Sequence, residues 1–123
     1  MATSVDRSPI PHNYTGLRND SWVESFTFKD KATQDPINLT LYTVIAQVRK
    51  KAGMPVILEA VDGDGLAIEG ADNNTLKIFK TISALPGEYI REIQLTRISD
   101  GYARTYIKGT FLIVDDVARE VIP

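Results

Sequence analysis

The sequence predicts an all-β fold, because about seven short segments alternate apolar with polar residues and none has the longer period of a helix. Turn-forming Gly, Pro, Asn and Asp residues separate these segments at short intervals. The chain has 123 residues, the usual size of one domain. Together these observations predict an antiparallel, immunoglobulin-like β-sandwich of about seven strands with an extended N-terminal arm. A small barrel is the alternative.

Residues 1–19 differ from the rest, since they hold two prolines and show no sustained period. Proline lacks an amide donor and favours extended backbone, so we expect an extended arm here, followed by the sandwich domain at residues 20–123. A loosely ordered tail is the alternative. The arm carries three apolar side chains that we expect to contact a partner: Ile10, Tyr14 and Leu17.

The first strand is expected at residues 21–29, where Trp22, Phe26 and Phe28 alternate with smaller or polar residues and Glu24 interrupts the apolar face. Residues that favour turns follow at 30–38. The later strands are expected at 39–51, 54–61, 66–70, 75–80, 88–98 and 103–114.

Two connections between these strands have recognisable turn chemistry. Ser-Asp-Gly at 99–101 predicts a hairpin between the last two strands, because glycine accepts a positive φ. Residues 81–87 are expected to form one short helical turn that ends at Pro86 and Gly87.

Strand 88–98 carries charged residues on both of its faces. Arg91 and Arg97 alternate in phase with apolar residues, while Glu88 and Glu92 lie on the opposite face. This pattern predicts a strand covered on both sides, by a neighbouring subunit. Cross-strand ion pairs on a wet face are the alternative.

Composition excludes several classes of function. The formal net charge is −2, from 14 basic and 16 acidic residues, which gives no electrostatic case for nucleic acid or an anionic membrane. The absence of cysteine excludes disulfides, thiolate nucleophiles and cysteine-bound zinc. No apolar run approaches the roughly 20 residues that span a bilayer, and no secretory signal is visible at the N-terminus.

The stretch Val-Asp-Gly-Asp-Gly at 61–65 begins as a calcium loop can begin. Counting from Asp62, the third position is Asp64, but the fifth is Leu66 and the twelfth is Asn73, which do not supply the ligands of an EF-hand. A glycine-rich turn between strands is therefore expected. A different cation site that adds Asp72 stays open.

Catalytic chemistry is not expected. His12 is the only histidine, and it lies in the arm, away from any serine or aspartate with meaningful spacing. A catalytic triad needs its histidine oriented by packing. We therefore expect no enzyme and no cofactor.

Tyr102 and Tyr106 lie near the predicted hairpin between the last two strands, on the C-terminal side of its turn. Exposed tyrosines suit contact with a protein or stacking on a sugar. We take these two residues, with the three apolar residues of the arm, as the candidate partner-binding residues.

The order of the segments carries a resemblance to a known family. The matching features are the turn Pro36–Thr40, the strand end Gln47–Lys50, the stretch Leu85–Tyr89 and the closing Gly109–Phe111. Across residues 20–115 this pattern resembles a small β-sandwich domain of bacteriophage virion proteins, the N-terminal domain of baseplate upper proteins.

The resemblance implies a non-enzymatic structural adaptor in a phage tail, baseplate or neck. Its implied partners are other virion proteins and further copies of itself, and its implied location is the virion, assembled in the host cytoplasm. Baseplate proteins of this kind continue into a helical stalk, whereas this sequence stops at Pro123. Capsid decoration or a carbohydrate- or receptor-binding module are therefore the alternatives.

Overall fold

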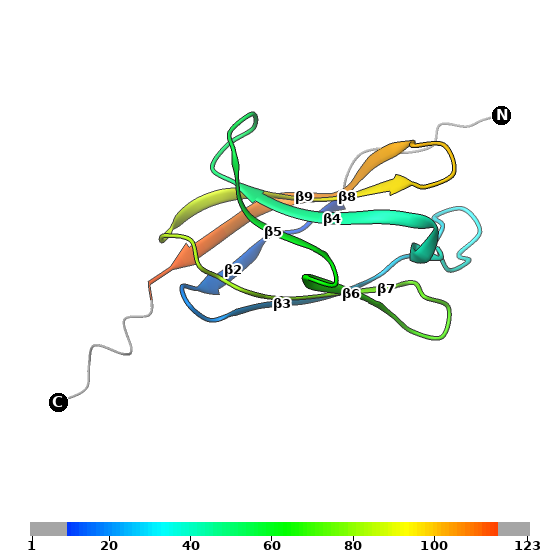
Figure 1. Cartoon of the computed structure of the whole chain (residues 1–123), viewed down its shortest axis with the longest axis horizontal. Coiled ribbons are helices and arrows are strands. Elements are labelled where there is room, and N and C mark those ends of the chain that lie inside the picture. Colours follow the sequence, from blue (N-terminus) through cyan, green and yellow to red (C-terminus); the bar gives the residue numbers. More distant parts are fainter. Residues whose placement is uncertain (1–9, 116–123) are drawn as a thin grey trace.

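The computed structural model describes residues 10–115, which form one curled, mixed β-sheet and a single-turn 3-10 helix (Figure 1). The strands are β1 (Ile10–Pro11), β2 (Tyr14–Leu17), β3 (Ser21–Thr27), β4 (Tyr42–Arg49), β5 (Val56–Asp62), β6 (Gly65–Glu69), β7 (Thr75–Thr81), β8 (Gly87–Arg97) and β9 (Ala103–Val114), and the helix is η1 (Leu39–Leu41). The predicted all-β class is confirmed. No helix within these residues is long and apolar enough to cross a membrane.

The sheet curls so that its two halves face each other. Its strand order is β1-β9-β8-β4-β5-β6-β7-β3, and β2 also pairs with β9. In Figure 1, β9, β8 and β4 lie in one layer, β3, β7 and β6 lie in the other, and β5 leads from the first to the second. β5 and β6 pair only next to the turn that joins them, at Val61–Asp62 with Gly65–Leu66, and this turn makes the curl.

The strand directions differ in part from the expected antiparallel arrangement. β1 and β2 run parallel to β9, and β5 pairs with β6 in parallel across their shared turn. An alternating sequence pattern shows which residues share a face but carries no information on the direction of the neighbouring strand. Residues 1–9 of the predicted arm and 116–123 of the predicted domain lie outside the described residues.

The core lies between the two layers and is built from the inward residues of each strand. Val44, Ala46 and Val48 of β4 are buried on one face, as their alternation predicts. Trp22 of β3 packs edge-on against Phe111 of β9, with ring centroids 5.0 Å apart, and both side chains are fully buried. These two aromatic rings join the layers at the centre of the fold.

A buried ion pair crosses the same core. Arg91 of β8 donates from Nη1 to Oε2 of Glu24 on β3 at 2.9 Å, and Nη2 contacts Oε1 of the same carboxylate. Oε1 also accepts from Nε1 of Trp22 at 2.8 Å. The side chains of Glu24 and Arg91 are only 6% and 1% exposed. Arg91 is thus covered by the chain itself, without the neighbouring subunit that its pattern predicted, and it is not on a wet face.

Of the segments between the long strands, one has the structure that the sequence predicts and two do not. Residues 98–102 form the predicted hairpin turn, with Gly101 at φ 74°. Residues 82–86 contain no helical turn, and the hydroxyl of Tyr89 donates to the carbonyl of Leu85 at 2.7 Å across this connection. Leu39–Leu41 form η1 in place of the expected strand, because the Asn38 side chain accepts from the Thr40 amide and caps a helical turn.

Candidate functional site

The N-terminal segment at residues 10–17 lies along β9 of its own chain. The His12 amide donates to the carbonyl of Lys108 at 3.1 Å, and the Asn13 side chain accepts from the Thr110 amide at 2.9 Å. Between these bonds, a Cβ added at Gly109 would overlap the carbonyl oxygen of His12. Glycine at position 109 therefore permits the close approach of the two backbones.

The three candidate residues of this segment have different surroundings. The ring of Tyr14 packs 5.1 Å from that of Phe111, and its hydroxyl accepts from the Val23 amide at 3.3 Å. Ile10 and Leu17 stay at the surface, 62% and 37% exposed. Tyr14 is thus used inside the fold, whereas the other two remain available for contact.

His12 reaches the buried ion pair from the molecular surface. Its Nδ1 lies 3.4 Å from Oε2 of Glu24, and its ring meets Phe26 edge-on at 5.0 Å. The Glu24 carboxylate already accepts hydrogen bonds from Trp22 and Arg91. This cluster therefore ties the N-terminal segment to both layers. The alternation of the sequence shows the inward phase of Glu24 and Arg91, but it does not show that these two residues and His12 meet.

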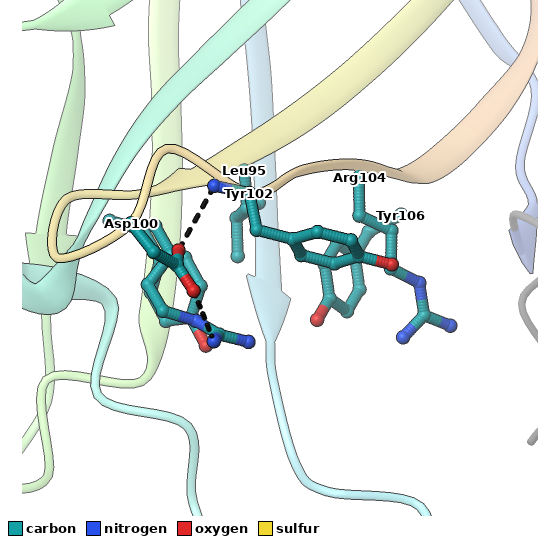
Figure 2. Close-up of a pocket in the computed structure, with 7 residues that line it drawn as sticks. Leu95, Asp100, Tyr102, Arg104 and Tyr106 are labelled. Carbon is teal, nitrogen blue, oxygen red and sulfur yellow. Dashed lines mark hydrogen bonds and ion pairs between the residues drawn. The ribbon is translucent and has the colours of Figure 1, made fainter.

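A pocket lies at the end of the β8–β9 hairpin, where β4 begins (Figure 2). Its volume is about 330 Å³, within the usual range for ligand pockets. We call it the hairpin pocket, and it is lined by Tyr42, Leu95, Arg97, Asp100, Tyr102, Arg104 and Tyr106.

Asp100 organises one side of the hairpin pocket. Its carboxylate accepts from the Tyr102 amide and from Nη1 of Arg97, each at 3.0 Å, as the dashed lines in Figure 2 show. The charge of Asp100, followed by a hydrogen bond with Tyr42, raises the pKa of the Arg97 guanidinium. This guanidinium stays cationic and lies 5.5 Å from the centre of the Tyr102 ring.

The other side of the pocket is fixed by contact with the core. The guanidinium of Arg104 lies 4.6 Å from the centre of the Tyr106 ring, and that ring meets Phe28 edge-on at 5.8 Å. The lining thus combines three tyrosines and two arginines with one aspartate. Tyrosine and arginine are enriched among the residues that dominate binding energy at protein interfaces.

The structure brings together two of the five candidate residues. Tyr102 and Tyr106 line the hairpin pocket, and Tyr102 is 45% exposed. Tyr42, Arg97 and Arg104 also line the pocket, and none of them was a candidate residue from the sequence. The spacing of Arg97 and Arg104 on either side of the Ser-Asp-Gly turn was the available signal, because a tight hairpin brings its flanking residues together.

The Asp62–Gly65 stretch forms a tight turn with Gly63 and Gly65 at φ 84° and 89°. The Asp64 amide donates to the Val61 carbonyl at 2.8 Å, and its carboxylate accepts from Nζ of Lys80 at 2.9 Å. Within residues 10–115 there is no group of three or more acidic or histidine side chains that could hold a metal ion.

Comparison with known proteins finds only distant structural similarity. No family model matches the sequence, and no curated protein matches it. A solved structure of the NK cell receptor Nkp44, a triggering partner in natural cytotoxicity, is 10% identical, with a TM-score of 0.49 over 85% of this chain and 99% of that one.

A second solved structure is a family 123 glycoside hydrolase from Clostridium perfringens, which is 14% identical with a TM-score of 0.36. The similarity covers 85% of this chain and 23% of the hydrolase. Likenesses this distant assign the chain to no family and no activity.

Proposed function

We propose that this chain is a non-enzymatic structural protein of a bacteriophage virion, acting as an adaptor in a tail, baseplate or neck assembly. The resemblance of residues 20–115 to a virion β-sandwich domain is the source of this proposal. Its partners are other virion proteins and further copies of itself. Its location is the virion, assembled in the host cytoplasm.

The hairpin pocket is the observation that carries the adaptor role. Adaptors work by contact, and the pocket offers aromatic and guanidinium groups held in place by Asp100 and by the core. Such groups lose little conformational freedom when a partner covers them, because their geometry is already fixed. Its two arginines and one aspartate favour an acidic partner segment.

The finer fold within this proposal is an immunoglobulin-like sandwich made by the two facing layers. In such domains the hydroxyl of a tyrosine forms a hydrogen bond with the backbone a few residues upstream. The residue two positions after this tyrosine is a cysteine, and its disulfide crosses to the other sheet. Here Tyr89 bonds to Leu85, and two residues later Arg91 pairs with Glu24 across the core. The ion pair stands where the disulfide of those domains would be.

The test is quantitative mass spectrometry of phage particles purified from the strain that encodes the chain. We expect the chain in intact particles at a constant ratio to the tail proteins. Tyr102→Ala should lower its incorporation, whereas Gln94→Ala, at an exposed position on β8, should not. Particles that are complete without the chain would refute the virion role. Recovery with tail-less heads would favour capsid decoration.

A carbohydrate-binding role is the second candidate, because the pocket gathers tyrosine rings with cationic groups. Tyrosine faces stack on sugar rings, and guanidinium groups bind acidic substituents. Calorimetry with the purified chain and acidic oligosaccharides tests this role. Binding that Tyr106→Ala removes would support it.

A further inference from the structure

The outer face of β3, β7 and β6 carries an apolar pair that the core does not use. Val23 of β3 and Phe79 of β7 are direct cross-strand partners, and their side chains are 46% and 61% exposed. Their sequence neighbours Trp22 and Ile78 are fully buried, so this pair points away from the core. The outer face of an antiparallel layer is usually polar, so this adjoining valine and phenylalanine form an exposed apolar patch there.

A hollow lies beside this pair on the same face. It is lined by Phe79 and Lys77 of β7 and by β6 with its turn, and its volume is about 380 Å³. Next to the turn, the residues of β6 that share this face are small, because Gly65 has no side chain and Ala67 has only a methyl group, whereas Glu69 lies at the far end of the strand. One surface thus carries a protruding ring next to a shallow depression.

We infer that this face is the contact between two copies of the chain. A two-fold axis parallel to the strands, between β6 and β7, places Phe79 of each copy over Gly65 of the other. A surface that carries both the protrusion and the depression complements itself, as a two-fold contact requires. Two sheets packed face to face in this way keep their strands roughly aligned.

Charge on the face fits the same arrangement. Lys77 pairs with Ala67 in the β6–β7 register, and Glu69 lies diagonally from it, opposite Thr75. Neither Lys77 nor Glu69 forms an ion pair with another residue between 10 and 115. In the dimer, the Lys77 ammonium of each copy approaches Glu69 of the other, which gives two intermolecular ion pairs.

The size of the face sets the strength of this contact. Three strands about 4.8 Å apart and roughly seven residues long cover on the order of 300 Å² per copy. A standard stable interface buries about 800 Å² per partner. The isolated dimer is therefore weak, and a high local concentration in an assembly strengthens it.

Sedimentation velocity of the full chain from about 10 μM to about 1 mM tests the contact, since a face this small implies micromolar or weaker association. We expect a reversible shift from monomer to dimer. Phe79→Ser should leave only monomer, and Leu85→Ser, at a residue that is 63% exposed elsewhere, should dimerise as the unaltered chain does. Equal circular dichroism melting curves show that both variants fold.

Charge reversal then identifies the pairing. Lys77→Glu and Glu69→Lys should each be monomeric, because each places like charges opposite one another. An equimolar mixture of these two variants should form a heterodimer, since only that combination restores both intermolecular pairs. A monomeric chain at 1 mM, a dimer that survives Phe79→Ser, or a mixture that stays monomeric would each overturn the inference. The purified chain suffices for these tests, so their failure leaves the particle measurement unaffected.

Discussion

Glu24 and Arg91 are the residues on which the interior of this molecule most depends. Two charges almost without solvent access are tolerated because Nη1 and Nη2 of Arg91 both contact the Glu24 carboxylate and Trp22 adds a further hydrogen bond to it. Nε of Arg91 is buried without a hydrogen-bond partner among the described residues. The sequence shows both residues in phase with apolar neighbours. It does not show that β3 and β8 face each other, so the pairing was not predictable from the alternation alone.

Removing one partner of this pair should be strongly destabilising. Arg91→Met leaves the Glu24 carboxylate buried without its cation, and we expect a loss of about 3–5 kcal/mol in the free energy of unfolding. Urea unfolding measures this quantity. Arg97→Met, which breaks the exposed pair with Asp100, should cost less than about 1 kcal/mol. Similar losses of stability in the two variants would contradict the burial of the Glu24–Arg91 pair.

Asp30 gives a prediction of pH dependence. The amides of Thr33 and then Ala32 donate to its carboxylate and lower its pKa below the ordinary value. Because folding lowers this pKa, the ionised Asp30 carboxylate stabilises the folded state at pH values above the ordinary pKa of an aspartate. This stabilisation is lost as the pH falls through the folded value. NMR titration of the side-chain carboxyl carbon should place the Asp30 midpoint below that of Asp30 in the unfolded chain, and a midpoint at or above it contradicts the loop geometry.

At the scale of elements, the N-terminal strands depend on a single glycine of β9. Gly109→Ala should push residues 10–17 away from β9, because the added methyl group overlaps the His12 carbonyl. We expect a loss of about 1–3 kcal/mol and faster hydrogen exchange at the His12 amide. Thr110→Ala, which keeps its backbone bond to Asn13, is the control. Unchanged exchange at His12 in Gly109→Ala would show that the segment docks differently.

The sequence located most strands, but apart from the β8–β9 hairpin it did not predict their partners. Residues 103–114 were expected as a strand and form β9 with the same bounds, because their alternation is long and regular. The strands β1 and β2 were expected only as an extended arm. A segment of two to four residues with prolines has too little pattern to reveal a strand, and its place beside β9 depends on contacts distant in sequence.

At the scale of the whole molecule, the chain offers two separate surfaces for contact. The hairpin pocket is made by β4, β8, β9 and their connections, whereas the Phe79 face belongs to β3, β6 and β7. These strands lie in different layers in Figure 1. A module with two independent surfaces can hold a foreign partner on one and a copy of itself on the other, which is what an adaptor requires.

The candidate site was partly predictable at this scale. Tyr102 and Tyr106 were chosen from their place beside a hairpin signal, and both line the pocket. Tyr42 joins them only because β4 pairs with β8 in the register that sets Tyr42 opposite Arg97. A register between strands about 50 residues apart follows from packing of the whole core, and no local pattern contains it.

The most direct test of the adaptor role is a photo-cross-link from the hairpin pocket inside assembled particles. Position 102 is replaced by a benzophenone amino acid, with position 94 on β8 as the control, and the irradiated particles are analysed by mass spectrometry. We predict a covalent link from position 102 to another virion protein, with none from position 94. Particles that contain the altered chain but show no link from position 102 to any virion protein would contradict the account.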